Sequence, residues 1–212
     1  MRALVIVALL AGDTSANRFE VAPTSVALSA SNRAAMLDVS NHGSEAMRFQ
    51  VTVATWTQDR GGVPTYTVTT DVEAFPTLFE VAPGATKHVR VGTRLAAGAT
   101  ERAYRVFVEE LPHARPAGAG VQVVTRMAIP IFIAPVRQTE VISVSIDNNA
   151  VVVSNTGTLH VRPTTIRIGT VEVPGWYVLP GDRRRFQIAA SCASRVELVF
   201  ESGPRAFNAS CK

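Results

Sequence analysis

The chain has 212 residues, of which 47% are hydrophobic and 18% are charged, so it can form a folded core and is not a disordered chain. This length suits one large domain or two domains of about 100 residues each. The formal net charge is only +4, and the single basic run, residues 183–185, has no interleaved aromatic residues. The composition therefore predicts no nucleic-acid partner.

The first sixteen residues are typical of a secretory signal. Met1 and Arg2 supply a positive end, residues 3–11 are apolar, and small residues at positions 14–16 suit cleavage. The apolar run is too short to cross a bilayer, which takes about 20 residues as a helix, and no later stretch approaches that length. We predict an exported protein without membrane insertion whose mature chain starts near Asn17.

Alternation of apolar and polar residues recurs through the rest of the chain and predicts short, half-buried strands. The clearest examples cover residues 47–53 and 104–108, and shorter ones cover residues 89–91, 142–146, 151–153, 166–168, 171–173 and 196–200. Clusters of Gly, Pro, Asn and Asp separate these segments, and no long helix signal competes with them. The pattern predicts an all-β fold, because each strand must bury its apolar face against another sheet.

An internal repeat divides the chain into two parts. Residues 79–84, which end in Pro83-Gly84, and residues 89–91 are matched by residues 176–181, which end in Pro180-Gly181, and residues 186–188. A looser repeat relates residues 39–43 to residues 153–157, and the second copy is shorter between these landmarks. We predict two related β-domains over residues 17–136 and 137–212, with an extra hairpin over residues 56–72 of the first.

Residues for catalysis or metal binding form no recognisable pattern. The sequence lacks a nucleophile elbow, a P-loop and a dinucleotide-binding glycine motif. None of the histidines has a second ligand at metal spacing. They are His42, His88, His113 and His160. We predict a protein that is not an enzyme and that has no catalytic residue, no metal site and no cofactor.

The two cysteines, Cys192 and Cys211, lie near the C-terminus. In an exported protein an even pair favours a disulfide. Two buried free thiols are the alternative, because geometry and not the count of cysteines decides.

Residues 121–133 are unusual for a structural strand, because strands typically have five or six residues. Pro130 lies on one face and cannot donate a ladder hydrogen bond, which indicates an edge strand or a bulge. A long apolar edge strand favours aggregation unless a partner covers it. An ordinary last strand explains residues 129–133, but it explains less well the part that follows the Gly-, Pro- and Ala-rich residues 113–120. The residues of the other face are apolar except for Thr125. They begin with Val121, Val123, Thr125, Met127 and Ile129 and end with Ile133.

The order and spacing of several short motifs resemble a known family. The motifs are Asp-Val-Ser-Asn at residues 38–41, Pro83-Gly84, Tyr-Arg-Val-Phe-Val-Glu-Glu-Leu-Pro at residues 104–112, and residues 125–135. Together with the repeat and the signal, they resemble the periplasmic pilus chaperones of the chaperone–usher pathway, the PapD-like family, and especially its non-classical Csu-like branch. The resemblance implies two Ig-like β-sandwich domains in an L-shaped arrangement, a periplasmic location, and pilus subunits and an outer-membrane usher as partners.

The resemblance also implies donor-strand complementation, in which the chaperone lends the last strand of its first domain to a subunit that lacks one. In this chain the lent strand would be the unusual segment. Alternate side chains would enter pockets of the subunit while the backbone ladder fixes the register. Whether the free protein covers this strand by forming a dimer is left open. The donor residues would be Val121, Val123, Thr125, Met127 and Ile129.

Members of the family hold the C-terminal carboxylate of the subunit with one Arg and one Lys in the cleft between the domains. In this sequence Ser25 and Pro130 stand at those two positions, so the usual anchors are missing. Arg126, on the same strand face as Pro130, and Arg105, on the preceding strand, are the candidate substitutes. Either guanidinium could hold a carboxylate through two parallel hydrogen bonds.

Two other classes of protein are compatible with the strand pattern. A secreted Ig-like structural or adhesive protein, including a pilus subunit, is one alternative, although subunits usually carry one incomplete domain. An exported module that binds a small ligand or a metal, or a hydrolase without a known motif, is the other.

Overall fold

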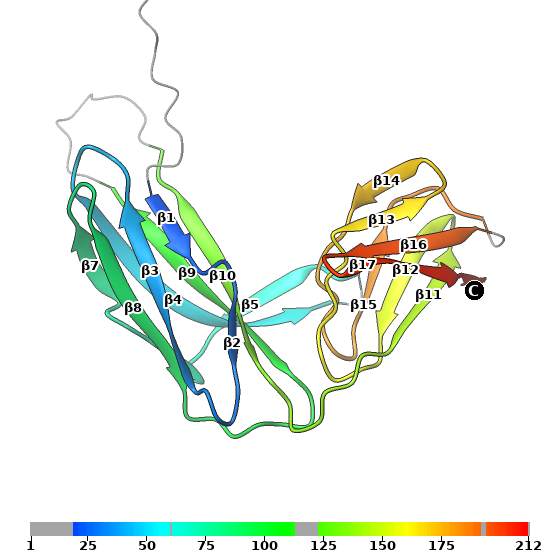
Figure 1. Cartoon of the computed structure of the whole chain (residues 1–212), viewed down its shortest axis with the longest axis horizontal. Coiled ribbons are helices and arrows are strands. Elements are labelled where there is room, and N and C mark those ends of the chain that lie inside the picture. Colours follow the sequence, from blue (N-terminus) through cyan, green and yellow to red (C-terminus); the bar gives the residue numbers. More distant parts are fainter. Residues whose placement is uncertain (1–18, 60, 113–122, 192–193, 212) are drawn as a thin grey trace, which may run out of the picture.

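A computed structural model of the chain describes residues 19–59, 61–112, 123–191 and 194–211. The described residues form strands and no helix, so none of them could cross a membrane as a helix. The strands build two Ig-like β-sandwiches that meet at an angle, which confirms the predicted all-β, L-shaped arrangement (Figure 1).

The first sandwich has one sheet in the order β1-β3-β8-β6 and a second in the order β2-β10-β9-β4-β5, with β7 also paired to β4. All these pairs are antiparallel except β10 and β2, which are parallel. The strands are β1 (Phe19–Ala22), β2 (Val26–Leu28), β3 (Ala34–Asn41), β4 (Met47–Gln58), β5 (Pro64–Val68), β6 (Val72–Phe75), β7 (Leu78–Val81), β8 (Thr86–Thr93), β9 (Arg102–Leu111) and β10 (Arg126–Ile133).

The second sandwich has sheets in the orders β15-β12-β11-β18 and β14-β13-β16-β17. The predicted boundary between residues 136 and 137 falls between β10 and β11. The strands are β11 (Ile142–Asp147), β12 (Ala150–Asn155), β13 (Thr165–Ile168), β14 (Val171–Pro174), β15 (Arg183–Phe186), β16 (Arg195–Phe200), β17 (Gly203–Asn208) and β18 (Ser210–Cys211).

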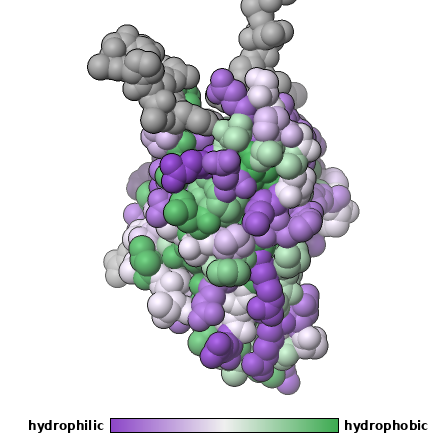
Figure 2. All heavy atoms as spheres, turned by 90° about the vertical axis from the view of Figure 1, so that its left-hand side faces the viewer, coloured by the Kyte–Doolittle hydropathy of each residue, from purple (hydrophilic) through white to green (hydrophobic). Residues whose placement is uncertain are grey.

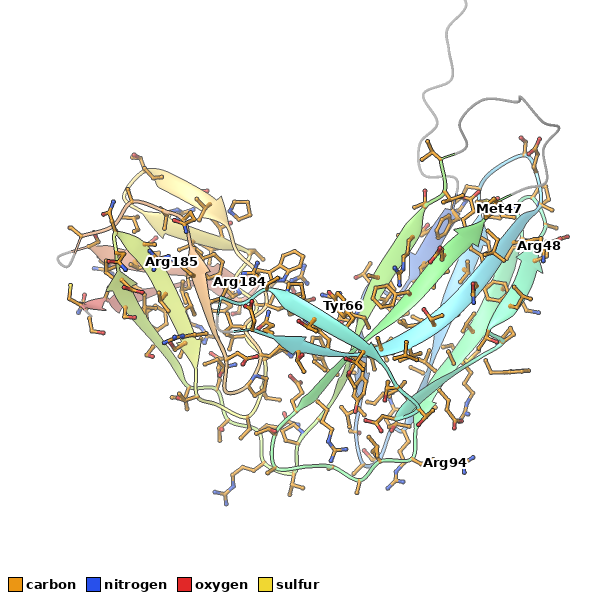
Figure 3. The ribbon with its side chains drawn as sticks, turned by 180° about the vertical axis from the view of Figure 1, so that it is seen from behind. Met47, Arg48, Tyr66, Arg94, Arg184 and Arg185 are labelled. Atoms are coloured by element: carbon orange, nitrogen blue, oxygen red, sulfur yellow. The ribbon has the colours of Figure 1, made fainter. Side chains whose placement is uncertain are left out.

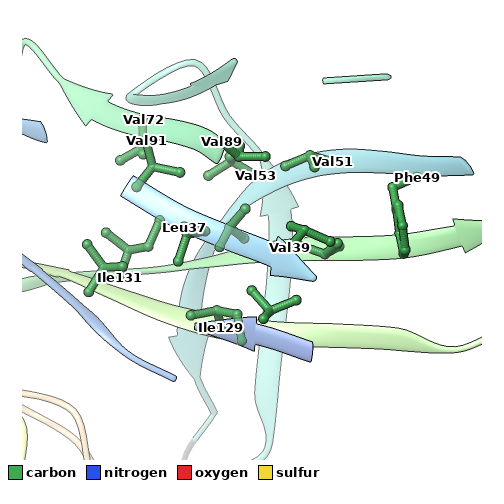
Figure 4. Close-up of a cluster of buried hydrophobic side chains, with 14 of the residues drawn as sticks. Leu37, Val39, Phe49, Val51, Val53, Val72, Val89, Val91, Ile129 and Ile131 are labelled. Atoms are coloured by element: carbon green, nitrogen blue, oxygen red, sulfur yellow. The ribbon is translucent and has the colours of Figure 1, made fainter. Parts of the chain in front are cut away.

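The core of the first domain is formed by the inward-facing residues of its two sheets (Figure 4). Along β4 the burial alternates from Met47 to Val53, as the sequence pattern predicts. Each aliphatic side chain buried in this way contributes roughly 1.5–3 kcal/mol. The residues labelled in Figure 4 are Leu37, Val39, Phe49, Val51, Val53, Val72, Val89, Val91, Ile129 and Ile131.

The two domains share a buried hydrogen-bond pattern, which confirms the internal repeat. In the first domain the Asn41 side chain, 0% exposed, donates to the carbonyl oxygens of Glu45 and Val81 and accepts from the Gly43 amide. Its backbone carbonyl accepts from the amide of Gly84, the glycine of the Pro-Gly turn.

The second domain has an equivalent asparagine at Asn155, which is 1% exposed. Its side chain donates to Leu159 and Val178 and accepts from Gly157, while its carbonyl accepts from Gly181. Each asparagine therefore ties two turns to one strand inside its own sandwich.

The face of the first domain that points away from the second has polar and apolar residues intermixed (Figure 2). On the sheet that contains β3 and β8, His88 Nδ1 lies 2.6 Å from Asp38 Oδ1, and His42 Nε2 lies 3.3 Å from Glu20 Oε2. These contacts fit a solvated sheet face. His113 lies outside the described residues.

Cys211 is disulfide-bonded and lies on β18, which pairs in parallel with β11. Cys192, its predicted partner, lies outside the described residues. The Cys192–Cys211 pairing therefore stays a prediction.

We predict that Asn155→Ala lowers the free energy of unfolding by about 2–4 kcal/mol, because it leaves two carbonyls and one amide unpaired inside the second domain. Urea unfolding followed by circular dichroism measures the change. Asn208→Ala is the control, because Asn208 is exposed on β17. Equal stability of the two variants would contradict a structural role for Asn155.

Candidate functional site

The two domains meet at a cluster of buried apolar side chains. Trp56, Ala103 and Phe132 come from the first domain, and Tyr177 and Leu179 come from the second. The rings of Trp56 and Tyr177 pack edge to face, with centroids 5.1 Å apart and planes at 81°. Aromatic packing of this kind adds to the burial of apolar area and holds the two domains in contact.

A pocket of about 340 Å³ lies beside this cluster, and both domains line it. The described residues that line it include two arginines and no Asp or Glu, so the pocket is electropositive. The lining includes Thr24, Arg105 and Pro130 from the first domain, and Arg162, Trp176 and Tyr177 from the second.

Arg105 faces the pocket because its neighbours on β9, Tyr104 and Val106, face the core. It is only 6% exposed, and its guanidinium carbon lies 4.0 Å from the centroid of the Trp56 ring. Its Nη1 donates to the carbonyl oxygen of Ala128 at 3.1 Å, while its buried Nε has no acceptor. Such contact with an aromatic face stabilises a cation that has lost its water.

Burial lowers the pKa of Arg105, and the positive charge of Arg162 acts in the same direction, against the opposing effect of Tyr66 and Tyr177. An arginine begins from such a high pKa that it stays protonated at neutral pH. The pocket therefore holds a buried positive charge.

Arg162 brings a second guanidinium from the other domain. Its guanidinium carbon lies 5.0 Å from the centroid of the Tyr177 ring, and that of Arg105 lies 5.5 Å from the same centroid. Among the described residues Arg162 pairs with the carboxylate of Glu201 at 4.0 Å, and that pair is largely exposed. Exposed pairs of this kind contribute little, so Arg162 can turn to an anion in the pocket. Two guanidiniums beside one ring can hold a carboxylate by charge-assisted hydrogen bonds.

Arg126, the other candidate anchor, lies outside this pocket. The register pairs Arg105 with Pro130 and Arg126 with Glu109, so Arg126 lies four residues from Pro130 along the strand, or about 13 Å. Its guanidinium lies 3.9 Å from the Phe107 ring centroid, and its Nε lies 3.5 Å from Glu109 Oε2. The geometry brings Arg105 to the pocket and leaves Arg126 at the start of β10.

The last strand of the first domain is shorter than the sequence pattern suggests. β10 begins at Arg126, and residues 123–125 are described but form no strand, while Val121 lies outside the described residues. From Arg126 to Pro130 the strand pairs only with β9, because β2 pairs with residues 131–133 alone. The first half of β10 thus has a free edge among the described residues.

The expected donor residues fall into two groups. Val123 is 81% exposed and Thr125 is also exposed, so both side chains are available to a partner. Met127 is half-buried against the first core, and Ile129 is 5% exposed within it. Ile129 therefore completes the chain's own sandwich, and its side chain is not free to enter a partner.

The sequence patterns gave no reason to include Arg162 or Tyr177 in the site. The only signal at Arg162 was its place in the repeat, where Val161-Arg162 corresponds to Met47-Arg48. A repeat shows equivalent positions in two folds but does not show which of them faces the other domain. The packing of the two sandwiches supplies that information.

The family model described as pili and flagellar-assembly chaperone, PapD N-terminal domain, matches residues 18–139. Because this match covers more than half of the 212 residues, the chain belongs to that family of pilus-assembly chaperones. Membership in this family of periplasmic chaperones places the protein in the periplasm, while the predicted secretory signal, residues 1–16, lies outside the described residues. No match was found among curated protein sequences.

Solved structures of pilus chaperones share the fold over nearly the whole chain. One is the CsuC–CsuE chaperone–tip adhesion subunit complex of Acinetobacter baumannii, with a TM-score of 0.71 and 20% identity, covering 92% of this chain and 99% of the matched chain. Another is the Salmonella enterica SafA pilin in complex with the SafB chaperone, with a TM-score of 0.71, 16% identity, and coverage of 92% and 97%. The Escherichia coli chaperone DraB matches with a TM-score of 0.66 and 17% identity, covering 91% of this chain and 98% of the matched chain.

Proposed function

We propose that this protein is a periplasmic, non-enzymatic chaperone that binds pilus subunits by donor-strand complementation and delivers them to an outer-membrane usher. The observation that carries the proposal is the free edge of β10 next to an exposed apolar segment. An unpaired edge in a folded domain is a template for another strand. The membership of the chain in the chaperone family supports this interpretation.

In this mechanism a subunit strand pairs with the edge of β10 and with the residues before it. Val123 and Val124, which are 81% and 40% exposed, lie in the segment that the subunit would cover. Once paired with the subunit as a strand, the segment would present Val121, Val123 and Met127 on one face, with Thr125 between them as a weaker filler. Each aliphatic side chain buried in a subunit contributes roughly 1.5–3 kcal/mol before the cost of ordering the segment. A few such contacts give a complex that is stable and can still be exchanged.

The pocket between the domains supplies the second half of the mechanism. We assign the role of carboxylate anchor to Arg105 together with Arg162. The C-terminal carboxylate of the subunit would accept hydrogen bonds from the two guanidiniums and would supply the acceptor that the Arg105 Nε lacks. Anchoring one end of the subunit sets the register in which its strand meets β10, because a shift by one residue would turn every side chain to the wrong face.

We predict that Val123→Asp abolishes the recovery of a co-expressed subunit while the chaperone stays folded, because a charge would have to enter an apolar groove. Subunit recovered from periplasmic extracts is the measurement. Val136→Asp is the matched control, because Val136 is 79% exposed on the interdomain connection, as against 81% for Val123. Undiminished recovery with Val123→Asp would contradict the assignment of the donor segment.

We predict that Arg162→Ala and Arg105→Met each reduce the preference for a free C-terminal carboxylate. The probe is a peptide with the last residues of a subunit, made as the free acid and as the amide. Because one charge-assisted contact contributes about 1.5–3 kcal/mol, each variant should lower the acid-to-amide affinity ratio by roughly tenfold or more, as measured by calorimetry.

Arg126→Ala tests the alternative anchor. The geometry predicts an unchanged acid-to-amide ratio, because Arg126 contacts Glu109 and Phe107 and does not line the pocket. A loss of the preference with Arg126→Ala, and not with Arg105→Met or Arg162→Ala, would reverse the assignment.

A further inference from the structure

The hairpin of β4 and β5 extends beyond its own sheet toward the second domain (Figures 1 and 3). β4 pairs with β9 only as far as Thr55, and the remaining residues of β4, from Trp56 to Gln58, pair with β5 alone. The part of the hairpin beyond Thr55 falls in the stretch, residues 56–72, that is missing from the second copy of the sequence repeat.

Gln58, the last residue of β4, binds the backbone of the second domain with both ends of its amide. Its Nε2 donates to the carbonyl oxygen of Tyr177 at 2.9 Å, and its Oε1 accepts from the amide of Leu179 at 3.0 Å. Gln58 is 9% exposed, so both bonds are buried. A carboxamide can donate and accept at once, so the side chain acts like one rung of a β-ladder between the domains.

The turn of the hairpin fits closely against β15. Gly62 has a φ of +81°, and a Cβ at this position would lie 2.5 Å from Cγ of Arg184. Arg184 Nη1 donates to the carbonyl oxygen of Gly62, and Figure 3 shows Arg184 beside the hairpin. Asp59 Oδ1 accepts from the amides of Gly61 and Val63 and so fixes the turn in advance. A side chain at position 62 would push the hairpin and β15 apart.

These contacts act on the residues that shape the basic pocket. Gln58 holds the backbone of Tyr177, whose ring lies near both Arg105 and Arg162. Trp56 lies two residues before Gln58 on β4, and the guanidinium of Arg105 packs against its ring. The same short strand end thus sets the position of one arginine directly and that of the other through Tyr177.

We propose that the β4–β5 hairpin is an interdomain clamp, with Gln58 as the positioning residue that sets the spacing of Arg105 and Arg162. The effect of the clamp on subunit binding rests on the proposed function. Its effect on the angle between the domains can be tested on the protein alone. A second contact joins the domains elsewhere, because the buried Glu101 carboxylate lies 2.6 Å from His160 Nδ1. Removal of the clamp therefore loosens the angle between the domains without separating them.

The first experiment measures residual dipolar couplings in the free, isotopically labelled protein. If the clamp holds the domains, the couplings of both wild-type domains fit one common alignment tensor. In Gln58→Leu the couplings of the two domains fit two tensors of different magnitude. Gln50→Leu is the matched control, because Gln50 is an exposed glutamine on the same strand. A single common tensor in Gln58→Leu would overturn the proposal.

If Gln58→Leu fails to fold, two other substitutions in the contact between the turn and β15 test the clamp, and a third serves as their control. Arg184→Ala removes the bond to Gly62, and Arg183→Ala removes the same charge from the exposed neighbouring residue. Gly62→Ala forces the close contact with Arg184. We expect Arg184→Ala and Gly62→Ala to separate the two tensors and Arg183→Ala to leave them equal. Equal tensors in all three variants would again overturn the proposal.

The second experiment measures the acid-to-amide affinity ratio of the C-terminal subunit peptide. Gln58→Leu should lower this ratio by about three- to tenfold, while Gln50→Leu should leave it unchanged, because the clamp acts only through the spacing of the arginines. An unchanged ratio in Gln58→Leu together with separated tensors would show that the hairpin does not position the anchor. Absence of any acid preference in the wild type would instead contradict the proposed function, and the tensors would still decide whether the hairpin is a clamp.

Discussion

The structure depends on how a buried positive charge is held between two domains. Moving a guanidinium out of water costs free energy that must be offset by partners. Arg105 has the Trp56 ring and the Ala128 carbonyl as partners, no carboxylate among its recorded contacts, and one nitrogen without an acceptor. The pocket therefore contains a buried cation with an unpaired donor, and such a group favours an anion as its partner.

Local features of the chain were predictable from the sequence because they arise from local causes. A strand with one buried face must alternate, and β4 does so from Met47 to Val53. The repeat was visible because Asn41 and Asn155 each need the same neighbouring turns to satisfy a buried amide. Even the extra hairpin could be inferred, since one copy is longer than the other between fixed landmarks.

The choice between Arg105 and Arg126 needed the packing of the domains. Strand alternation places both on the outward face of the same sheet, so a sequence pattern cannot separate them. The register and the position of the second sandwich separate them, because they bring Tyr177 near Arg105, which lines the pocket, while Arg126 lies at the start of β10. Arg162 and Gln58 were missed for the same reason. Gln58 binds residues 119 and 121 positions away, and Arg162 lies 57 residues from Arg105, so periodicity carries no information about either contact.

The two sandwiches have the same asparagine-centred framework, and two features of the first carry the proposed function. One is the last strand, which is free along half its edge. The other is the hairpin, which joins the domains through the neutral amide of Gln58, beside the pocket, and through the hydrogen bond from Arg184 to the carbonyl oxygen of Gly62. A neutral contact next to two guanidiniums has a physical advantage, because a carboxylate there would compete with the ligand for the same cations. The junction can thus be rigid while the pocket keeps its charge for the subunit.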